Sequence, residues 1–281
     1  MKFVKLTTDD NVELNGFHYS ANNPRKVVVH IHGSCGNFYE NPFIHVLGKK
    51  LLESNVDLVT MNLRTSGCIV EAYGDDWMGY LGGSLAEFMS CIEDISTIVR
   101  YAQGYSEHVV LQGHSLGCDR VLAYCIERGF SGQIILLSPC DSYQLHVNRI
   151  SPEDFDSFLC RLRNFIPAHK FDLCPPEFYG IETEDVSYDI PISKNALLSI
   201  VEGYPYKLFR VSDSKNFNVD CDCLALIGEN DDLQTCPPHI LFNLINERCS
   251  RFVGEVLRGA DHDFFGAEAP LSDRIVKFVC L

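Results

Sequence analysis

Six apolar segments of strand length recur along this chain, and they constrain its fold more than any other feature. All are rich in β-branched residues and most are almost continuously apolar. Strands of this kind are expected where helices cover both faces of a parallel sheet. The chain is therefore predicted to fold as an α/β protein around a mostly parallel central sheet. The segments are Lys26–His32, Val56–Asn62, His108–Gln112, Gln133–Leu137, Cys223–Ile227 and Phe252–Leu257.

Helical patterns fill the intervals between these segments. In Ala86–Tyr101 the apolar residues recur every three or four positions and form one stripe, as in a helix that packs against a sheet. Strands that alternate with helices predict right-handed crossovers and helices on both faces. Strand-like segments on either side of Asp9-Asp10-Asn11 also predict an antiparallel pair at the N-terminus. The other helical intervals are Phe43–Ser54, Leu116–Arg128 and Leu271–Leu281.

One interval is much longer than a crossover requires. About 85 residues separate the strand that ends near Leu137 from the strand that begins near Cys223, whereas a crossover needs only about a dozen. The excess must form additional structure. We therefore predict a core domain of residues 1–139 and 220–281, with residues 140–219 inserted as a helical cap, or lid, over one end of the sheet.

Two helices are predicted within the cap. Ser151 has the features of an N-cap, with Pro152 at the first helical position and Asp154 completing a capping box. A second helix is expected over Lys194–Val201. The first helix has a wide apolar face that either packs on the rim of the core domain or roofs an apolar substrate pocket. If it forms a roof, the side chains expected to contact substrate are Phe155, Phe158 and Leu159.

The charge and the cysteine content argue against several classes of function. The net charge of −15 disfavours binding to nucleic acids and to anionic membrane surfaces. No run of about 18 apolar residues predicts a membrane span, and without a signal peptide a cytoplasmic location is expected. The thirteen cysteines are expected to be free thiols, and the Cys221-x-Cys223 spacing does not suit a zinc site. Neither a metal nor a cofactor is expected.

The sequence Gly-His-Ser-Leu-Gly, from Gly113 to Gly117, lies between a predicted strand and a predicted helix. This context matches a nucleophile elbow, in which a sharp turn presents a serine at the N-terminus of a helix. Glycines are needed on both sides because the strand and the helix pass close to one another. Ser115 is therefore the candidate nucleophile.

A nucleophilic serine needs a base and an acid that orients the base. His262 lies in a glycine-flanked loop after the last predicted strand, at the edge of the sheet where ligands bind in open α/β folds. Asp231 and Asp232 both follow the preceding strand. Asp231 is favoured as the acid, and a shift of one residue in the turn would place Asp232 there instead.

An oxyanion hole completes the candidate site. Gly33 follows the first inner strand, so the backbone N–H of Ser34 can face the reacting carbonyl, and Leu116 would supply the second N–H. Cys35 and His114 adjoin these positions and are also expected to touch the substrate, which would be a small molecule that carries an acyl group.

Taken together, these motifs resemble those of the α/β-hydrolase superfamily, and they occur in the same order over nearly the whole chain. The resemblance implies an α/β-hydrolase fold and a serine hydrolase that cleaves a carboxylic ester or a thioester through an acyl-enzyme on Ser115. It does not define the substrate, because one fold supports many reactions. An acyltransferase or amidase with the same triad, and a ligand-binding or receptor module with slow turnover, remain alternatives.

Overall fold

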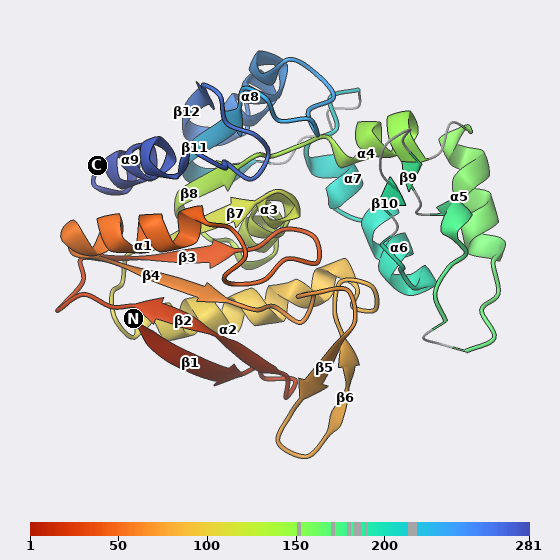
Figure 1. Cartoon of the computed structure of the whole chain (residues 1–281), viewed down its shortest axis with the longest axis horizontal. Helices are drawn as coiled ribbons and strands as arrows, with labels where there is room; N and C mark the ends of the chain where they lie inside the picture. Colours follow the sequence, from red (N-terminus) through yellow and green to blue (C-terminus); the bar gives the residue numbers. More distant parts are fainter. Residues whose placement is uncertain (151–152, 170–171, 179–180, 183–186, 189, 213–217) are drawn as a thin grey trace.

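A computed structural model describes residues 1–150, 153–169, 172–178, 181–182, 187–188, 190–212 and 218–281. In this part of the chain, eight strands form one sheet in the order β1-β2-β4-β3-β7-β8-β11-β12 (Figure 1). Neighbouring strands from β4 to β12 are parallel, and β2 pairs antiparallel with both β1 and β4. The strands are β1 (Lys2–Thr7), β2 (Glu13–Tyr19), β3 (Lys26–Ile31), β4 (Val56–Met61), β7 (Val109–His114), β8 (Gly132–Leu137), β11 (Val219–Gly228) and β12 (Cys249–Leu257).

Helices cover both faces of this sheet, as the almost continuous apolarity of the strands predicts. In β3, Val27 and Val29 belong to the hydrophobic cluster that includes residues of α2, α3 and α8, whereas Val28 belongs to the cluster that includes residues of α1 and α9. All three valines are fully buried, because successive strand residues point to opposite faces and both faces are covered. The helices are α1 (Phe43–Glu53), α2 (Cys91–Gln103), α3 (Leu116–Arg128), α8 (Pro238–Asn246) and α9 (Glu268–Val279).

The predicted helix over Ala86–Tyr101 begins later than expected. A short 3-10 helix, η1 (Phe88–Ser90), comes first, and α2 starts at Cys91. The backbone N–H of Phe88 donates to the hydroxyl of Ser199, which belongs to the inserted segment. The periodicity of the helix does not reveal this contact between distant parts of the chain.

A hairpin that the sequence did not predict follows β4. Its strands, β5 (Val70–Tyr73) and β6 (Met78–Leu81), pair with one another and form a separate two-stranded sheet. The hairpin projects from the core near the N-terminal end of α2 (Figure 1). Its strands are only four residues long and expose several apolar side chains, so they lack the buried apolar run that marks the core strands.

The segment between β8 and β11 lies beyond the carboxyl ends of the parallel strands (Figure 1). It contains a hydrophobic cluster of its own, to which Phe158, Leu197 and Tyr206 belong. Leu208 and Phe209 belong instead to the core cluster that contains residues of α2, α3 and α8. No helix in the described residues is long and apolar enough to cross a bilayer. The elements of the segment are α4 (Ser142–Leu145), η2 (His146–Ile150), α5 (Phe155–Asn164), η3 (Pro176–Phe178), β9 (Ile181–Glu182), β10 (Ser187–Tyr188), α6 (Lys194–Val201) and α7 (Pro205–Leu208).

Helix α5 differs from its prediction in both its start and its role. It begins at Phe155, and the carboxylate of Asp154 caps it by accepting from the N–H of Ser157; the predicted cap residues 151–152 lie outside the described residues. Phe158 is fully buried inside the inserted segment. Phe155 packs on Tyr143 and Tyr206, and Leu159 packs against the same cluster. The apolar face of α5 therefore forms the interior of the insertion, because its partners come from earlier and later parts of the same segment.

Candidate active site

Ser115 occupies a strained turn between β7 and α3. Its backbone angles are φ 53° and ψ −128°, in a region that residues with side chains rarely adopt. A Cβ atom on Gly113 would lie 2.3 Å from the carbonyl oxygen of Gly117, and one on Gly117 would lie 2.2 Å from the carbonyl oxygen of Ile31. Both glycines are therefore required for the close approach that presents Ser115 at the N-terminus of α3.

His262 and Asp231 are hydrogen bonded to one another. The Nδ1–H of His262 donates to Oδ1 of Asp231 over 2.9 Å, so of the two carboxylates that the sequence left open, Asp231 is the one paired with this ring. Asp231 also accepts from the N–H of Leu233 and from the amide of Gln234. Burial alone would raise the pKa of Asp231, but these hydrogen bonds outweigh it, with His262 the strongest, and the pKa is lowered. The carboxylate is thus held ionised and oriented.

The hydrogen bond to Asp231 leaves Nε2 of His262 with its lone pair free. This atom is buried and makes no hydrogen bond within the described residues. Among the described residues, no hydrogen bond joins the hydroxyl of Ser115 to Nε2 of His262. The residue before Ser115, His114, contacts the backbone of His262 through its ring. Hydrogen bonds between a nucleophile and its base are often long without ligand and tighten when substrate binds.

His114, which was expected to touch the substrate, instead holds the loop that carries His262. It is almost completely buried, and its ring packs against Phe43, Phe264 and the ring of His262. Its Nε2–H donates to the carbonyl oxygen of His262 over 3.0 Å, and the hydroxyl of Ser138 donates to the same oxygen. The structure therefore places His114 among buried side chains behind the turn of Ser115, and its contact with substrate stays a prediction.

Stability should depend on pH through His114. Burial, with a smaller contribution from His262, lowers its pKa to about 4, whereas an unfolded histidine titrates near ~6.5. Between these values the unfolded chain binds a proton that the folded chain does not, so His114 reduces the free energy of unfolding as the pH falls. Urea unfolding of the native protein and of His114→Gln at several pH values measures this. The difference between their free energies of unfolding should narrow by about 1.4 kcal/mol per pH unit below pH ~6, and a constant difference would contradict the assignment.

The loop that carries Ser34 is held by two donors on its carbonyl groups. Nη1 of Arg120 donates to the carbonyl oxygens of His32 and Gly33 over 2.8 and 2.9 Å, and Nδ1–H of His32 also donates to Gly33. In a trans peptide the N–H points opposite to the C=O. Fixing the carbonyl of Gly33 therefore fixes the N–H of Ser34. Within the described residues, the N–H groups of Ser34 and Leu116 donate no hydrogen bond.

Arg120, which the sequence analysis missed, holds the backbone of this loop through its hydrogen bonds to His32 and Gly33. It lies in α3 and is only 2% exposed, and no motif marks it because its partners are backbone atoms of a distant loop. In Arg120→Met we expect kcat to fall by about 100-fold, which is comparable to the loss of one oxyanion donor. KM should change little, because Arg120 contacts the backbone of His32 and Gly33 and is itself almost completely buried. Arg120→Lys should recover part of kcat. Equal kcat in Arg120→Met and native protein, both folded by circular dichroism, would contradict this role.

Cys35 is half-buried, and its thiol lies against the backbone around Gly83. Its backbone has φ 49°, and its Sγ lies 2.7 Å from where a Cβ atom on Gly83 would be. Burial, followed by the neighbouring Cys68 thiol, raises its pKa to about 12, so it remains a neutral thiol. The structure also contains a pocket of about 1020 Å³. Its described lining includes none of the side chains that were expected to contact substrate, which are Cys35, His114, Phe155, Phe158 and Leu159.

Comparison of the sequence with protein-family models and with curated proteins finds no match. The structure, in contrast, is similar to solved structures over nearly its whole length. DcsB in complex with its substrate analogue is 13% identical, with a TM-score of 0.69 and coverage of 99% of this chain and 97% of that chain. Est1E from Butyrivibrio proteoclasticus with bound ferulic acid is 15% identical, with a TM-score of 0.68 and coverage of 98% and 97%. The α/β hydrolase GrgF from Penicillium sp. sh18 is 15% identical, with a TM-score of 0.66 and coverage of 99% and 97%.

These similarities agree with the architecture described above. The eight-stranded, mostly parallel sheet, the helices on both faces and the strained turn after β7 are shared features of one fold. The chain has the α/β-hydrolase fold.

Proposed function

We propose that this protein is a serine hydrolase that cleaves a carboxylic ester or a thioester. The observation that carries the proposal is the His262–Asp231 hydrogen bond at the same sheet edge as the strained turn of Ser115. A buried carboxylate on Nδ1 holds the imidazole in the tautomer whose Nε2 can accept a proton. The solved structures of the Pyrococcus furiosus esterase Pf2001 and of the α/β hydrolase GrgF, which share this fold, support a hydrolytic reaction.

The proposed reaction has two steps. Nε2 of His262 takes the proton of the Ser115 hydroxyl as the oxygen attacks the carbonyl carbon, and the imidazolium then protonates the leaving alcohol or thiol. The N–H groups of Ser34 and Leu116 stabilise the negative charge on the carbonyl oxygen. In the second step, water attacks the acyl group on Ser115 with His262 as base, which releases the carboxylic acid and restores the serine.

A fluorophosphonate probe tests the proposal directly. The probe forms a covalent bond with a serine only where a base activates it, so native protein should be labelled at Ser115, as located by mass spectrometry of peptides. Asp231→Asn should be labelled far more slowly, whereas Ser250→Ala, a change on the exposed strand β12, should be labelled like the native protein. Absence of labelling at Ser115 in folded native protein would favour the ligand-binding alternative.

Product analysis distinguishes hydrolysis from acyl transfer. With p-nitrophenyl butyrate as substrate and methanol added, a hydrolase should release mainly butyrate, whereas an acyltransferase should form mainly methyl butyrate. Parallel assays with a p-nitroanilide test for amidase activity. We expect release of p-nitrophenol with butyrate as the main product.

A further inference from the structure

Two free thiols, those of Cys35 and Cys68, lie next to one another at the candidate oxyanion loop (residues 32–36). Cys35 directly follows Ser34, and it forms a parallel β-bridge with Ser66, two residues before Cys68. The two side chains interact, and this contact is second only to burial among the causes that raise the pKa of Cys35. The fold therefore brings together two thiols that are far apart in the sequence.

The loop that carries Cys68 is hydrogen bonded to the candidate oxyanion loop. The N–H of Gly67 donates to the carbonyl oxygen of Cys35 over 3.0 Å. The hydroxyl of Ser66 donates to Nε2 of His32 over 2.9 Å. Because these bonds fix the two backbones relative to one another, the thiols stay within reach without a large rearrangement of the chain.

Residues 82–84 support both cysteines from another side. The Sγ of Cys35 lies 2.7 Å from where a Cβ atom on Gly83 would be. The N–H of Ser84 donates to the carbonyl oxygen of Cys68 over 3.0 Å. The backbone of Cys68 is thus held by the same segment against which the Cys35 thiol packs.

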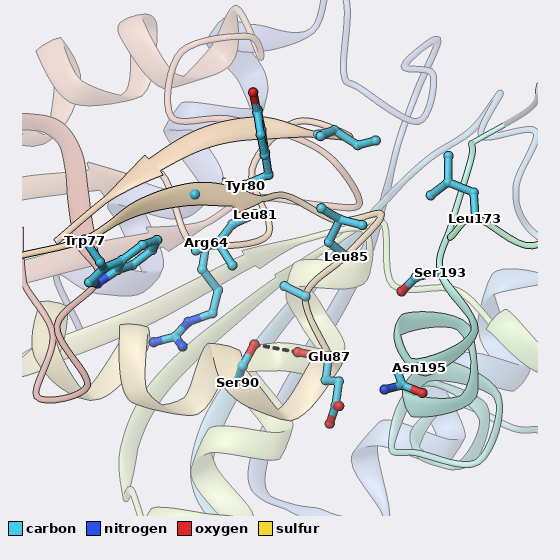
Figure 2. Close-up of a pocket in the computed structure, with 13 residues that line it drawn as sticks. Arg64, Trp77, Tyr80, Leu81, Leu85, Glu87, Ser90, Leu173, Ser193 and Asn195 are labelled. Atoms are coloured by element: carbon cyan, nitrogen blue, oxygen red, sulfur yellow. Dashed lines mark hydrogen bonds between the residues drawn. The ribbon is translucent and has the colours of Figure 1, made fainter. Parts of the chain in front are cut away.

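Cys68 is the member of the pair that a small solute reaches first. It is exposed, whereas Cys35 is half-buried. The residue after Cys68, Ile69, lines the pocket of about 1020 Å³, and Figure 2 shows Leu81 and Leu85 on the wall of the same pocket. An oxidant dissolved in water therefore meets the thiol of Cys68 before it meets that of Cys35.

Other neighbouring thiols lack such an accessible member. Cys125 interacts with Cys221, and Cys223 interacts with Cys249. The first three of these are buried and the fourth is half-buried. A redox-sensitive site needs a thiol that solvent reaches and a second thiol beside it. Of the pairs named here, the one beside Ser34 has both.

We propose that Cys35 and Cys68 are a modification site at which a peroxide forms a reversible disulfide, and that this bond slows catalysis at Ser115 by displacing the N–H of Ser34. The effect on catalysis rests on the proposed function. The disulfide itself can be measured without any enzymatic activity.

The oxidation takes place in two balanced steps. The sulfur of Cys68 attacks one oxygen of hydrogen peroxide, the O–O bond breaks, and the departing hydroxide takes the thiol proton to give water and a sulfenic acid, S–OH. The sulfur of Cys35 then attacks the sulfur of Cys68, the S–O bond breaks, and the hydroxyl leaves as water with the proton of the Cys35 thiol. Two thiols and one peroxide thus become one disulfide and two water molecules.

The new bond changes the position of the candidate oxyanion loop. A disulfide holds its two sulfur atoms about 2 Å apart, so Sγ of Cys35 must leave its contact with Gly83 and move toward Cys68. Arg120 holds the start of the loop through its carbonyl groups, so the shift falls on Ser34, between the two anchors. Because a misplacement of about 1 Å in an active site can slow a reaction by about 100-fold, we expect kcat to fall.

Peptide mapping tests the disulfide in the full-length protein. Trypsin leaves Cys35 in residues 27–49 and Cys68 in residues 65–100, so the disulfide joins two separate peptides with the loss of two hydrogen atoms. After treatment of the native protein with hydrogen peroxide we expect this joined pair, and dithiothreitol should separate it. Fragment ions should assign the bond to Cys68 rather than to the buried Cys91 of the same peptide.

Steady-state kinetics with p-nitrophenyl butyrate test the consequence. Peroxide should lower kcat of the native protein by at least about tenfold, with little change in KM, and dithiothreitol should restore it. Cys68→Ser should have a kcat within about twofold of native before treatment and should keep it after treatment. Cys160→Ser removes an exposed thiol from α5 instead, and it should respond to peroxide like the native protein.

The outcomes separate this proposal from the hydrolase proposal. Peroxide treatment that yields no joined peptides, whether Cys68 is unchanged or becomes a sulfinic acid, overturns the disulfide. A joined pair with unchanged kcat, or an equal loss of kcat in native protein and Cys68→Ser, overturns the effect on Ser34. If the joined peptides form but the reduced native protein neither reacts with a fluorophosphonate nor hydrolyses esters, the disulfide stands, and the hydrolase proposal fails together with the effect on catalysis.

Discussion

Ser115→Ala is expected to lower kcat for a p-nitrophenyl ester by about 10⁶-fold, the loss found when a triad nucleophile is removed. The reason is that no other hydroxyl is presented by the turn between β7 and α3, whose geometry depends on Gly113 and Gly117. KM should change little, because the substitution leaves the backbone N–H groups of Ser34 and Leu116 in place. Steady-state kinetics of the purified variant provide the measurement.

The control for this prediction is the fold of the variant. Removal of one hydroxyl from a residue that is already held at φ 53° should leave the melting temperature within a few degrees of the native value. Labelling by the fluorophosphonate should disappear in Ser115→Ala. Retention of more than about a tenth of the native kcat would show that Ser115 is not the nucleophile.

Asp231→Asn is expected to lower kcat by about 10⁴-fold, as in other triads in which the acid is replaced by its amide. The carboxylate of Asp231 is fully buried and accepts from Nδ1 of His262. An amide can donate its own N–H to Nδ1, which stabilises the tautomer with the proton on Nε2. The hydroxyl of Ser115 would then face an N–H donor at Nε2 of His262 instead of an acceptor. The geometry of the site would be kept, but His262 could no longer take up the proton of the hydroxyl.

Asp232→Asn is the matched control, because it makes the same change one residue away. It should keep kcat within about threefold of native, a change of less than ~1 kcal/mol in activation free energy. Similar losses in both variants, or a larger loss in Asp232→Asn, would show that the hydrogen bond between His262 and Asp231 does not orient the catalytic base. Circular dichroism of both variants excludes unfolding as the cause of any loss.

The core of the fold and the elbow were readable from the sequence for the same physical reason. Strands buried on both faces are mostly apolar, so β3, β4 and β8 stand out as nearly continuous apolar runs, although β3 contains His30 and β4 contains Asp57 and Thr60. The helix after Ser115 was also predicted with its observed bounds, Leu116–Arg128. In these places, apolar side chains indicate which residues are buried, and glycines indicate where the backbone makes a close turn.

The rest of the site depends on contacts between segments far apart in the sequence. Arg120 donates to the backbone carbonyl oxygens of His32 and Gly33. Because every residue type has a backbone carbonyl, the sequence gives no sign of such a partner. The pocket is walled by a hairpin with short, exposed strands and by Leu173 and Asn195 of the insertion, neither of which has a pattern that predicts a cavity. The sequence analysis expected Phe158 to contact substrate if its helix roofs a pocket, whereas in the structure Phe158 is fully buried within the insertion.

The sequence by itself therefore determined the α/β class, the order of strands and helices in the core, and the position of Ser115 on a turn that only glycines permit. The tertiary structure alone showed that His262 is hydrogen bonded to Asp231. It also showed that His114 and Arg120 donate to backbone carbonyls of the loops that carry His262 and Ser34, and where an apolar cavity lies. The physical reason is that periodicity and glycine requirements are local properties of a chain, whereas a hydrogen bond to a distant backbone atom and an unfilled volume exist only once the segments have packed.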